Sequence, residues 1–227
     1  MKRIAAVSIY AAAMGYLESA VVIYLRELAF GNSVQVFPLR YFEPQLGLLE
    51  IGREVATIVM LLSVSYLAGR SRLQKWMFFV YSFAIWDIFY YIFLRIFTGW
   101  PSSLFNFDVL FLIPVIWIGP VLSPVLISLL LAVSSLTIIL LREKSENIRI
   151  GLVDFGAFSL GSLIVFYSFT EQIFYILLSV GPKGMENFTP KSFDWLSFSI
   201  GYLIMCASAV KTIKDSYHKM KSEKVIQ

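Results

Sequence analysis

Long uninterrupted runs of apolar residues are the feature that most limits how this chain can fold. Of its 227 residues, 58% are hydrophobic, and the mean hydropathy is +0.75. A run of about 20 apolar residues is long enough to cross the hydrocarbon core of a bilayer as a helix. An isolated strand in lipid would leave its backbone groups unpaired, so each run is predicted to be helical. We therefore expect an all-α fold, a polytopic integral membrane helix bundle.

The apolar runs divide into six predicted transmembrane helices within a single membrane domain, residues 1–213. The first run follows Lys2 and Arg3 and continues to Leu25, which favours an uncleaved helix over a signal peptide. Residues 214–227 are polar and basic and are predicted to form a cytoplasmic tail. The six expected helices are 4–28, 46–68, 75–97, 121–141, 150–178 and 194–213.

The segment 104–120 is harder to interpret. It is apolar from Phe107 to Trp117, but this run is too short to cross a bilayer, and Pro114 and Pro120 interrupt it. We expect a short interfacial or re-entrant helix here. Asp108 is expected to cap the start of that helix, and the alternative is that it joins the acidic residues described below.

The positions of the basic residues predict the orientation of the bundle. With six spans, most Lys and Arg residues fall on the side that holds both termini, whereas the opposite side has few, among them Arg26, Arg40 and Arg95. Short cytoplasmic connectors carry an excess of Lys and Arg. Both termini are therefore predicted to be cytoplasmic, and the net charge of +4 is interpreted as an orientation signal rather than as nucleic-acid binding.

The supply of cysteine and histidine excludes several kinds of chemistry. Cys206 is the only cysteine, so the chain has no intrachain disulfide and no cysteine metal cluster. His218 is the only histidine and lies in the basic tail, which excludes bis-histidine haem, histidine zinc sites and Ser-His catalysis. No cofactor and no metal site are predicted.

Ionisable residues inside the predicted spans are the strongest indication of a functional site. Charge in hydrocarbon is costly, so such residues usually face a protein interior. Glu50, Arg53 and Glu54 stand at i, i+3 and i+4 and share one helical face. At about 1.5 Å per residue, Glu18 of the first helix and Asp87 of the third fall in the same half of the bilayer. We expect these three helices to bring their acids together.

Arg53 is the one base deep in the second helix, so it is expected to bridge Glu50 or Glu54 to Glu18 or Asp87. The remaining acids then need to be protonated, balanced by a cation, or bound by further hydrogen-bond donors. Tyrosines and Trp86 would supply such donors. Tyr90 flanks a stripe of residues spaced by four on the third helix. The candidate substrate- or ion-binding residues are Glu18, Glu50, Arg53, Glu54, Asp87, Tyr90, Tyr91 and Arg95.

This pattern leaves several functions open. Buried acid–arginine networks sometimes only fix the register of helices. The interpretation we rank first is a small transporter or channel-like protein that binds a small solute or ion and couples its movement to protons. An intramembrane enzyme that uses carboxylate acid–base chemistry on a lipid or isoprenoid is the second. The third is an accessory subunit or assembly factor, with a membrane-protein partner or a second copy of this chain besides the lipid bilayer.

Overall fold

The computed structural model describes residues 1–40, 44–145 and 148–226, and this part of the chain folds into a six-helix bundle. Gln227, the last residue of the predicted tail, lies outside it. The predicted all-α class is confirmed. The helices are α1 (Lys2–Phe30), α2 (Pro44–Ala68), α3 (Arg72–Thr98), α4 (Leu122–Lys144), α5 (Leu152–Ser179) and α6 (Trp195–Ile226).

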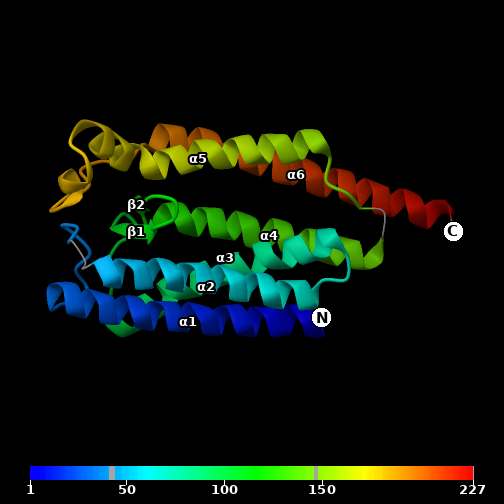
Figure 1. Ribbon diagram of the computed structural model, residues 1–227. Helices are drawn as coiled ribbons and strands as arrows, with labels where there is room; N and C mark the ends of the chain where they lie inside the picture. Colours follow the sequence, from blue (N-terminus) through cyan, green and yellow to red (C-terminus); the bar gives the residue numbers. More distant parts are fainter. Residues whose placement is uncertain (41–43, 146–147, 227) are drawn as a thin grey trace.

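The helices run up and down along one common direction (Figure 1). α5 and α6 form a layer of their own on one side of the bundle, and α1 to α4 form the rest. An even number of antiparallel helices returns the chain to its starting end, so the N-terminus and the end of α6 lie at the same end of the bundle. Glycine ends two helices, because Gly31 and Gly99 adopt left-handed φ angles of 63° and 73°.

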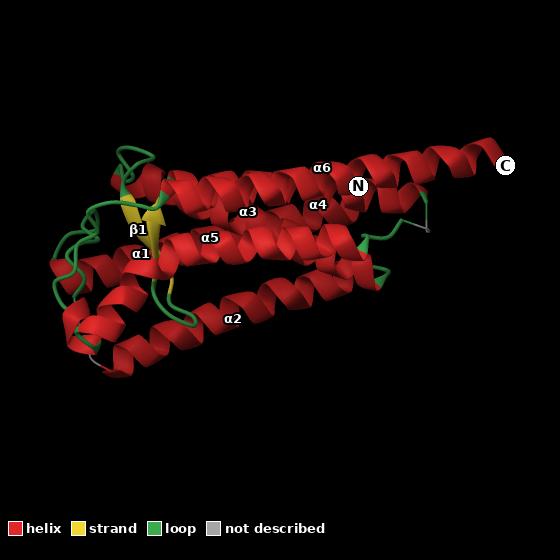
Figure 2. Cartoon of the chain, turned by 90° about the horizontal axis from the view of Figure 1, so that it is seen from above, coloured by secondary structure: helices red, strands yellow, loops and turns green. Residues whose placement is uncertain are grey.

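Five helices within the described residues are long and apolar enough to cross a membrane: α1, α3, α4, α5 and α6. This fits a multi-pass membrane protein. α2 is the exception; it carries the Glu50–Glu54 charges and packs against α1 and α3 (Figure 1), and Figure 2 shows it at the edge of the bundle. Its crossing of the bilayer therefore remains a prediction. α6 continues past the predicted end at residue 213 to Ile226 because its polar end is rich in good helix formers.

The prediction of a short helix in residues 104–120 was wrong. Two antiparallel strands form there instead, β1 (Phe107–Phe111) and β2 (Trp117–Pro120), with Phe107 opposite Pro120 and Asp108 opposite Gly119. The hairpin sits at the end of the bundle opposite the termini (Figures 1 and 2). It packs against the bundle, with Trp117 stacked on Phe169 of α5, and the two strands pair backbone groups with each other instead of within a helix.

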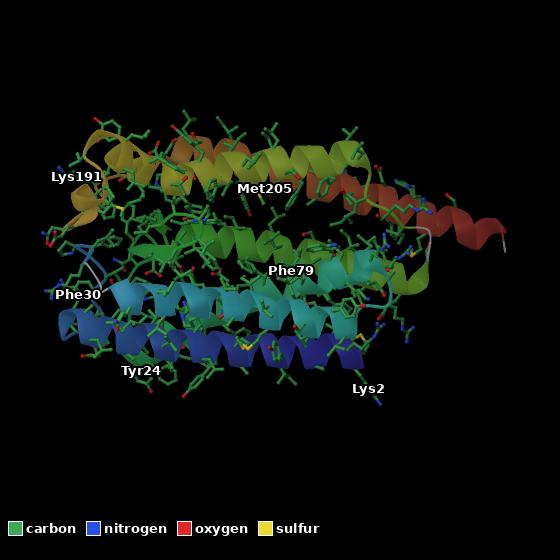
Figure 3. The ribbon with its side chains drawn as sticks, in the orientation of Figure 1. Lys2, Tyr24, Phe30, Phe79, Lys191 and Met205 are labelled. Carbon is green, nitrogen blue, oxygen red and sulfur yellow. The ribbon has the colours of Figure 1, made fainter. Side chains whose placement is uncertain are left out.

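Apolar side chains cover the outside of the bundle, as contact with lipid requires. Tyr24 points away from the neighbouring helices (Figure 3) and is 66% exposed, and Leu28 on the same helix is 75% exposed. Lys2 and Lys191 mark the two opposite ends of the bundle in the same view.

Glycines allow the closest helix contacts. A Cβ at Gly15 of α1 would lie 2.8 Å from the Trp86 carbonyl of α3, so the two backbones approach closely where Glu18 leaves α1. Gly161 of α5 and Gly201 of α6 face each other in the same way, each 2.7 Å from the other's carbonyl oxygen if a Cβ were added. Small residues serve the same purpose in membrane helix pairs generally.

Candidate functional site

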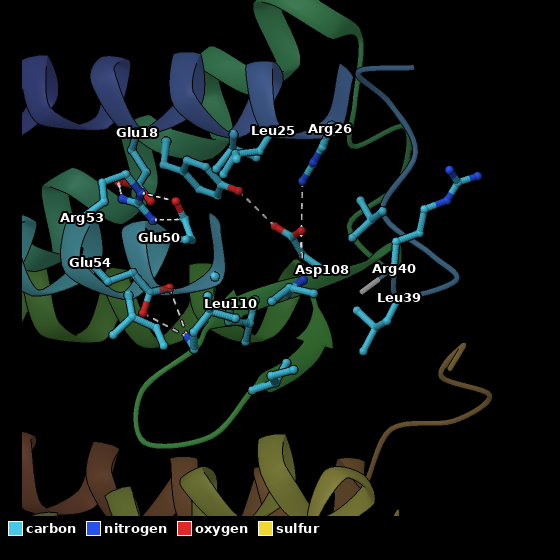
Figure 4. Close-up of a pocket in the computed structure, with 18 of the residues that line it drawn as sticks. Glu18, Leu25, Arg26, Leu39, Arg40, Glu50, Arg53, Glu54, Asp108 and Leu110 are labelled. Atoms are coloured by element: carbon cyan, nitrogen blue, oxygen red, sulfur yellow. Dashed lines mark hydrogen bonds and ion pairs between the residues drawn. The ribbon is translucent and has the colours of Figure 1, made fainter. Parts of the chain in front are cut away.

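A cavity of about 420 Å³ lies between α1, α2, α3 and the β-hairpin, and it extends to the loops at the hairpin end of the bundle (Figure 4). The short 3₁₀ helix η1 (Pro182–Met185) contributes to its wall. Charged and aromatic side chains line the cavity together with many apolar ones. The charged and aromatic members are Glu18, Arg26, Phe30, Arg40, Glu50, Arg53, Glu54, Trp86, Asp87, Tyr90, Tyr91, Asp108 and Glu186.

Arg53 holds two carboxylates from different helices on one side of the cavity. Its Nε donates to Glu50 Oε2 at 2.9 Å and its Nη2 to Glu50 Oε1 at 2.5 Å. Its Nη1 donates to Glu18 of α1. Glu50 therefore receives the two-pronged contact that the spacing i, i+3 predicts, and Glu18 supplies the carboxylate from another helix.

Glu54 fixes the tip of the hairpin. The backbone N–H of Leu112 donates to both carboxylate oxygens of Glu54, at 3.1 Å each. Glu54 is 5% exposed, and among the described contacts this neutral N–H is its only hydrogen-bond donor. The side chain thus has no ion-pair partner of its own in the described part of the chain.

Asp87, which lines the cavity from α3, shows the same feature. Ser128 of α4 donates its hydroxyl to Asp87 Oδ2 at 2.8 Å. The described ion pairs do not include Asp87. Within the described residues, two carboxylates that line the cavity, Glu54 and Asp87, are therefore bound by neutral donors only.

A second ion pair closes the cavity toward the hairpin. Arg26 Nη2 donates to Asp108 Oδ1 at 3.0 Å, and both side chains are almost completely buried. The Tyr90 hydroxyl donates to Asp108 Oδ2 at 3.3 Å, and the Arg26 guanidinium lies 4.0 Å from the centre of the Trp100 ring. Burial raises the pKa of Asp108 above its ordinary value, and the Arg26 charge opposes that rise.

The expectation that Asp108 caps a helix was wrong, because the residue lies in β1 and pairs with Arg26. Sequence reasoning missed this pair because it treated Arg26 only as a basic residue near the membrane surface. A usable signal existed in α1: Glu18, Val22 and Arg26 are spaced by four and therefore follow one stripe.

Seven of the eight candidate residues line this one cavity. The eighth, Arg95, does not. Arg95 donates instead to the carbonyls of Gly99 and Pro101, just beyond the end of α3. A cation near the last carbonyls of a helix is a common stabilising arrangement. The role of the other seven in binding stays a prediction.

The cavity carries an excess of acids. Among the described residues that line it, six are acidic and three are arginines, an excess of three carboxyl groups. Arg53 is shared by Glu18 and Glu50, and Arg26 is taken by Asp108. Glu186 is exposed, so water can screen its charge. For the acids deeper in the cavity, protons or a positively charged guest balance the remaining charge.

The described residues contain no group of three or more His, Cys, Asp or Glu side chains arranged to hold a metal ion. The acids are instead spread along the cavity wall: Arg53 binds Glu18 and Glu50, and other protein groups donate to Glu54, Asp87 and Asp108. Comparison with known proteins found no matching family model, no matching curated protein and no matching solved structure.

Proposed function

We propose that this protein binds a small positively charged solute or ion in the cavity and moves it across the membrane in exchange for protons. The proposal is supported by Glu54 and Asp87, two carboxylates in an apolar bundle. Among the residues that the structure describes, only neutral groups donate to them. A charge at such depth is costly unless it is neutralised.

Two kinds of partner neutralise a carboxylate in this setting. A proton removes its charge, and a bound cation balances it. Because both compete for the same oxygen atoms, cation binding must release protons, and a rise in proton concentration must release the cation. Such competition is sufficient for proton-coupled exchange when the cavity opens to each side in turn. The enzyme and accessory-subunit alternatives stay predictions.

Proton movement in liposomes tests the proposal. Purified protein is reconstituted with a pH-sensitive dye inside, the membrane potential is clamped, and a gradient of Na⁺, tetramethylammonium or choline is imposed. We expect at least one of these cations to drive protons the opposite way. Glu54→Gln and Asp87→Asn should each abolish the effect, since the amides keep the Leu112 and Ser128 hydrogen bonds but cannot exchange a proton.

Glu171→Gln is the matched control, because this acid lies on α5 and does not line the cavity. It should behave like the wild-type protein. Equal proton movement in the wild type, both cavity variants and protein-free liposomes would contradict the proposal.

A further inference from the structure

The cavity is far larger than a single inorganic ion needs. Its volume of about 420 Å³ lies in the range typical of sites for organic ligands, about 300–1,000 Å³. Its carboxylates do not converge as the ligands of a metal ion would among the described residues. Size and arrangement both favour a guest that carries its charge on an organic body.

The cavity wall has apolar and aromatic surface that can contact the organic part of such a ligand. Trp86, Tyr90 and Tyr91 line the cavity from α3, next to Asp87. Aromatic faces attract organic cations by cation–π interaction. The remaining wall is mainly aliphatic and comes from α1, the α1–α2 connection, α2 and the hairpin; it includes Val22, Leu25, Val36, Leu39, Ile51, Val109, Leu110, Leu112 and Ile116.

Two hydrogen-bond donors on lining side chains have no protein partner in the described part of the chain. They are Arg26 Nη1 and Trp86 Nε1, on residues that are each 5% exposed. An unpaired buried donor is costly, and an acceptor oxygen removes that cost. Because Asp108 already balances the charge of Arg26, a neutral oxygen suits this position better than a second anion.

The two polar ends of the cavity are well separated. Arg26 is eight residues beyond Glu18 on α1, which corresponds to about 12 Å along the helix. Trp86 of α3 contacts α1 at Gly15, which precedes Glu18, and Asp87 follows Trp86 directly. These two residues therefore lie toward one end of the cavity, and Arg26 lies toward the other. A guest that uses both ends must therefore be elongated.

Given the proposed cation binding, we propose that the ligand is an amphipathic organic cation: a positively charged nitrogen group near Glu54 and Asp87, an apolar body along the aromatic and aliphatic wall, and at least one neutral oxygen that accepts from Arg26 or Trp86. This inference rests on the proposed function and narrows its substrate class.

Four probes separate these features. Benzoylcholine carries all three, 3,3-dimethylbutyl benzoate lacks the charge, 4-phenylbutyltrimethylammonium lacks the oxygens, and tetramethylammonium lacks the apolar body. Binding is measured by calorimetry to the full chain in lipid nanodiscs, with empty nanodiscs as the reference. We expect benzoylcholine to bind about tenfold or more tightly than tetramethylammonium because it buries more apolar surface.

The neutral ester is expected to show no specific binding, and the oxygen-free cation to bind about threefold to tenfold more weakly than benzoylcholine. The double variant Arg26→Lys with Trp86→Phe keeps a positive charge opposite Asp108. It should bind benzoylcholine and 4-phenylbutyltrimethylammonium with similar affinity, somewhat lower than in the wild type because phenylalanine attracts a cation less strongly than tryptophan does. A thermal unfolding temperature close to that of the wild type is the check that the variant folds.

The outcomes distinguish the two proposals. If all the cations bind with equal affinity but depend on Glu54 and Asp87, the ligand class is wrong and the proposed function stands. If the oxygens have no effect in the wild type, the assignment of Arg26 and Trp86 is overturned. If the neutral ester binds as tightly as benzoylcholine, both proposals fail.

Discussion

Arg53 fixes α1 to α2 through a single guanidinium shared by Glu18 and Glu50. Sequence spacing predicted a contact of Arg53 with Glu50 or Glu54, because all three share a helical face, and the structure forms the contact with Glu50. Depth along the helices predicted that an acid from another span would join them. The choice of Glu18 over Asp87 could not be predicted, since Asp87 accepts a hydrogen bond from Ser128 of α4, and helix spacing does not show which neighbouring helix Asp87 faces.

Removal of this guanidinium should strongly destabilise the protein. Arg53→Gln leaves two carboxylates without their cation, and breaking a buried pair in this way typically costs about 3–5 kcal/mol. We expect a marked fall in the thermal unfolding temperature in detergent. Adding Glu18→Gln to Arg53→Gln should recover part of the loss because one orphaned charge is removed.

Lys211→Gln is the control for this experiment. It also breaks an ion pair, with Asp154, but the Lys211 side chain is 58% exposed. Solvent screens exposed pairs, so the change should be much smaller. Similar falls in the two single variants would show that Arg53 is not a structural centre.

The hairpin is the element that sequence reasoning missed. Residues 104–120 have the apolar composition of an interfacial helix, and three-dimensional packing decided otherwise. β1 places Asp108 against Arg26, and β2 places Trp117 against Phe169. These partners come from α1 and α5, far away in the sequence, so local propensity holds no information about them.

Glu54 should hold the hairpin tip in place. Glu54→Leu removes the acceptor for the Leu112 N–H and is expected to cost about 1–3 kcal/mol locally. Amide hydrogen exchange of residues 107–120 should then be faster by about tenfold or more. Glu54→Gln keeps a carbonyl acceptor and should stay close to the wild-type rate, so equally fast exchange in both variants would refute this role.

Asp194 caps the start of α6 and gives a pH-dependent contribution to stability. Its Oδ1 accepts from the Ser197 N–H at 3.0 Å, and the hydrogen bonds from Ser197 lower the pKa of Asp194. The ionised carboxylate is therefore stabilised in the folded state. This contribution is complete above the ordinary aspartate pKa and is lost as the pH falls through the lowered value.

Asp194→Ala should lower the free energy of unfolding by about 1 kcal/mol at neutral pH. The difference from the wild type should shrink in acid, which unfolding curves at several pH values will measure. Asp194→Asn keeps a neutral cap, so its stability should not share this acid dependence. A difference between Asp194→Ala and the wild type that is independent of pH would count against the assignment.

At the scale of the whole molecule, the six helices and the class of fold followed from apolar run length alone. Most boundaries were close, with α1 predicted as 4–28 and found as Lys2–Phe30, but α6 extends well past its predicted end at residue 213, to Ile226. Run length does not decide which helices cross the bilayer when charges interrupt them, as in α2. The orientation of the termini also stays a prediction, because it depends on the membrane rather than on the fold.

Cysteine labelling measures the orientation. In a Cys206→Ala background, single cysteines replace Lys191 at the hairpin end and Arg70 or Ser222 at the other end. An impermeant maleimide should label position 191 in intact cells, and positions 70 and 222 only after the membrane is permeabilised. Labelling of position 222 in intact cells would reverse the predicted orientation.

Gly161 and Gly201 have a consequence for how the sequence can vary. Each occupies the space that a methyl group on the other would need, so a change at one cannot be compensated by a change at its counterpart. A saturation library of viable variants should therefore be depleted of substitutions at both sites. Gly156, one and a half turns away with open space around it, should accept alanine freely.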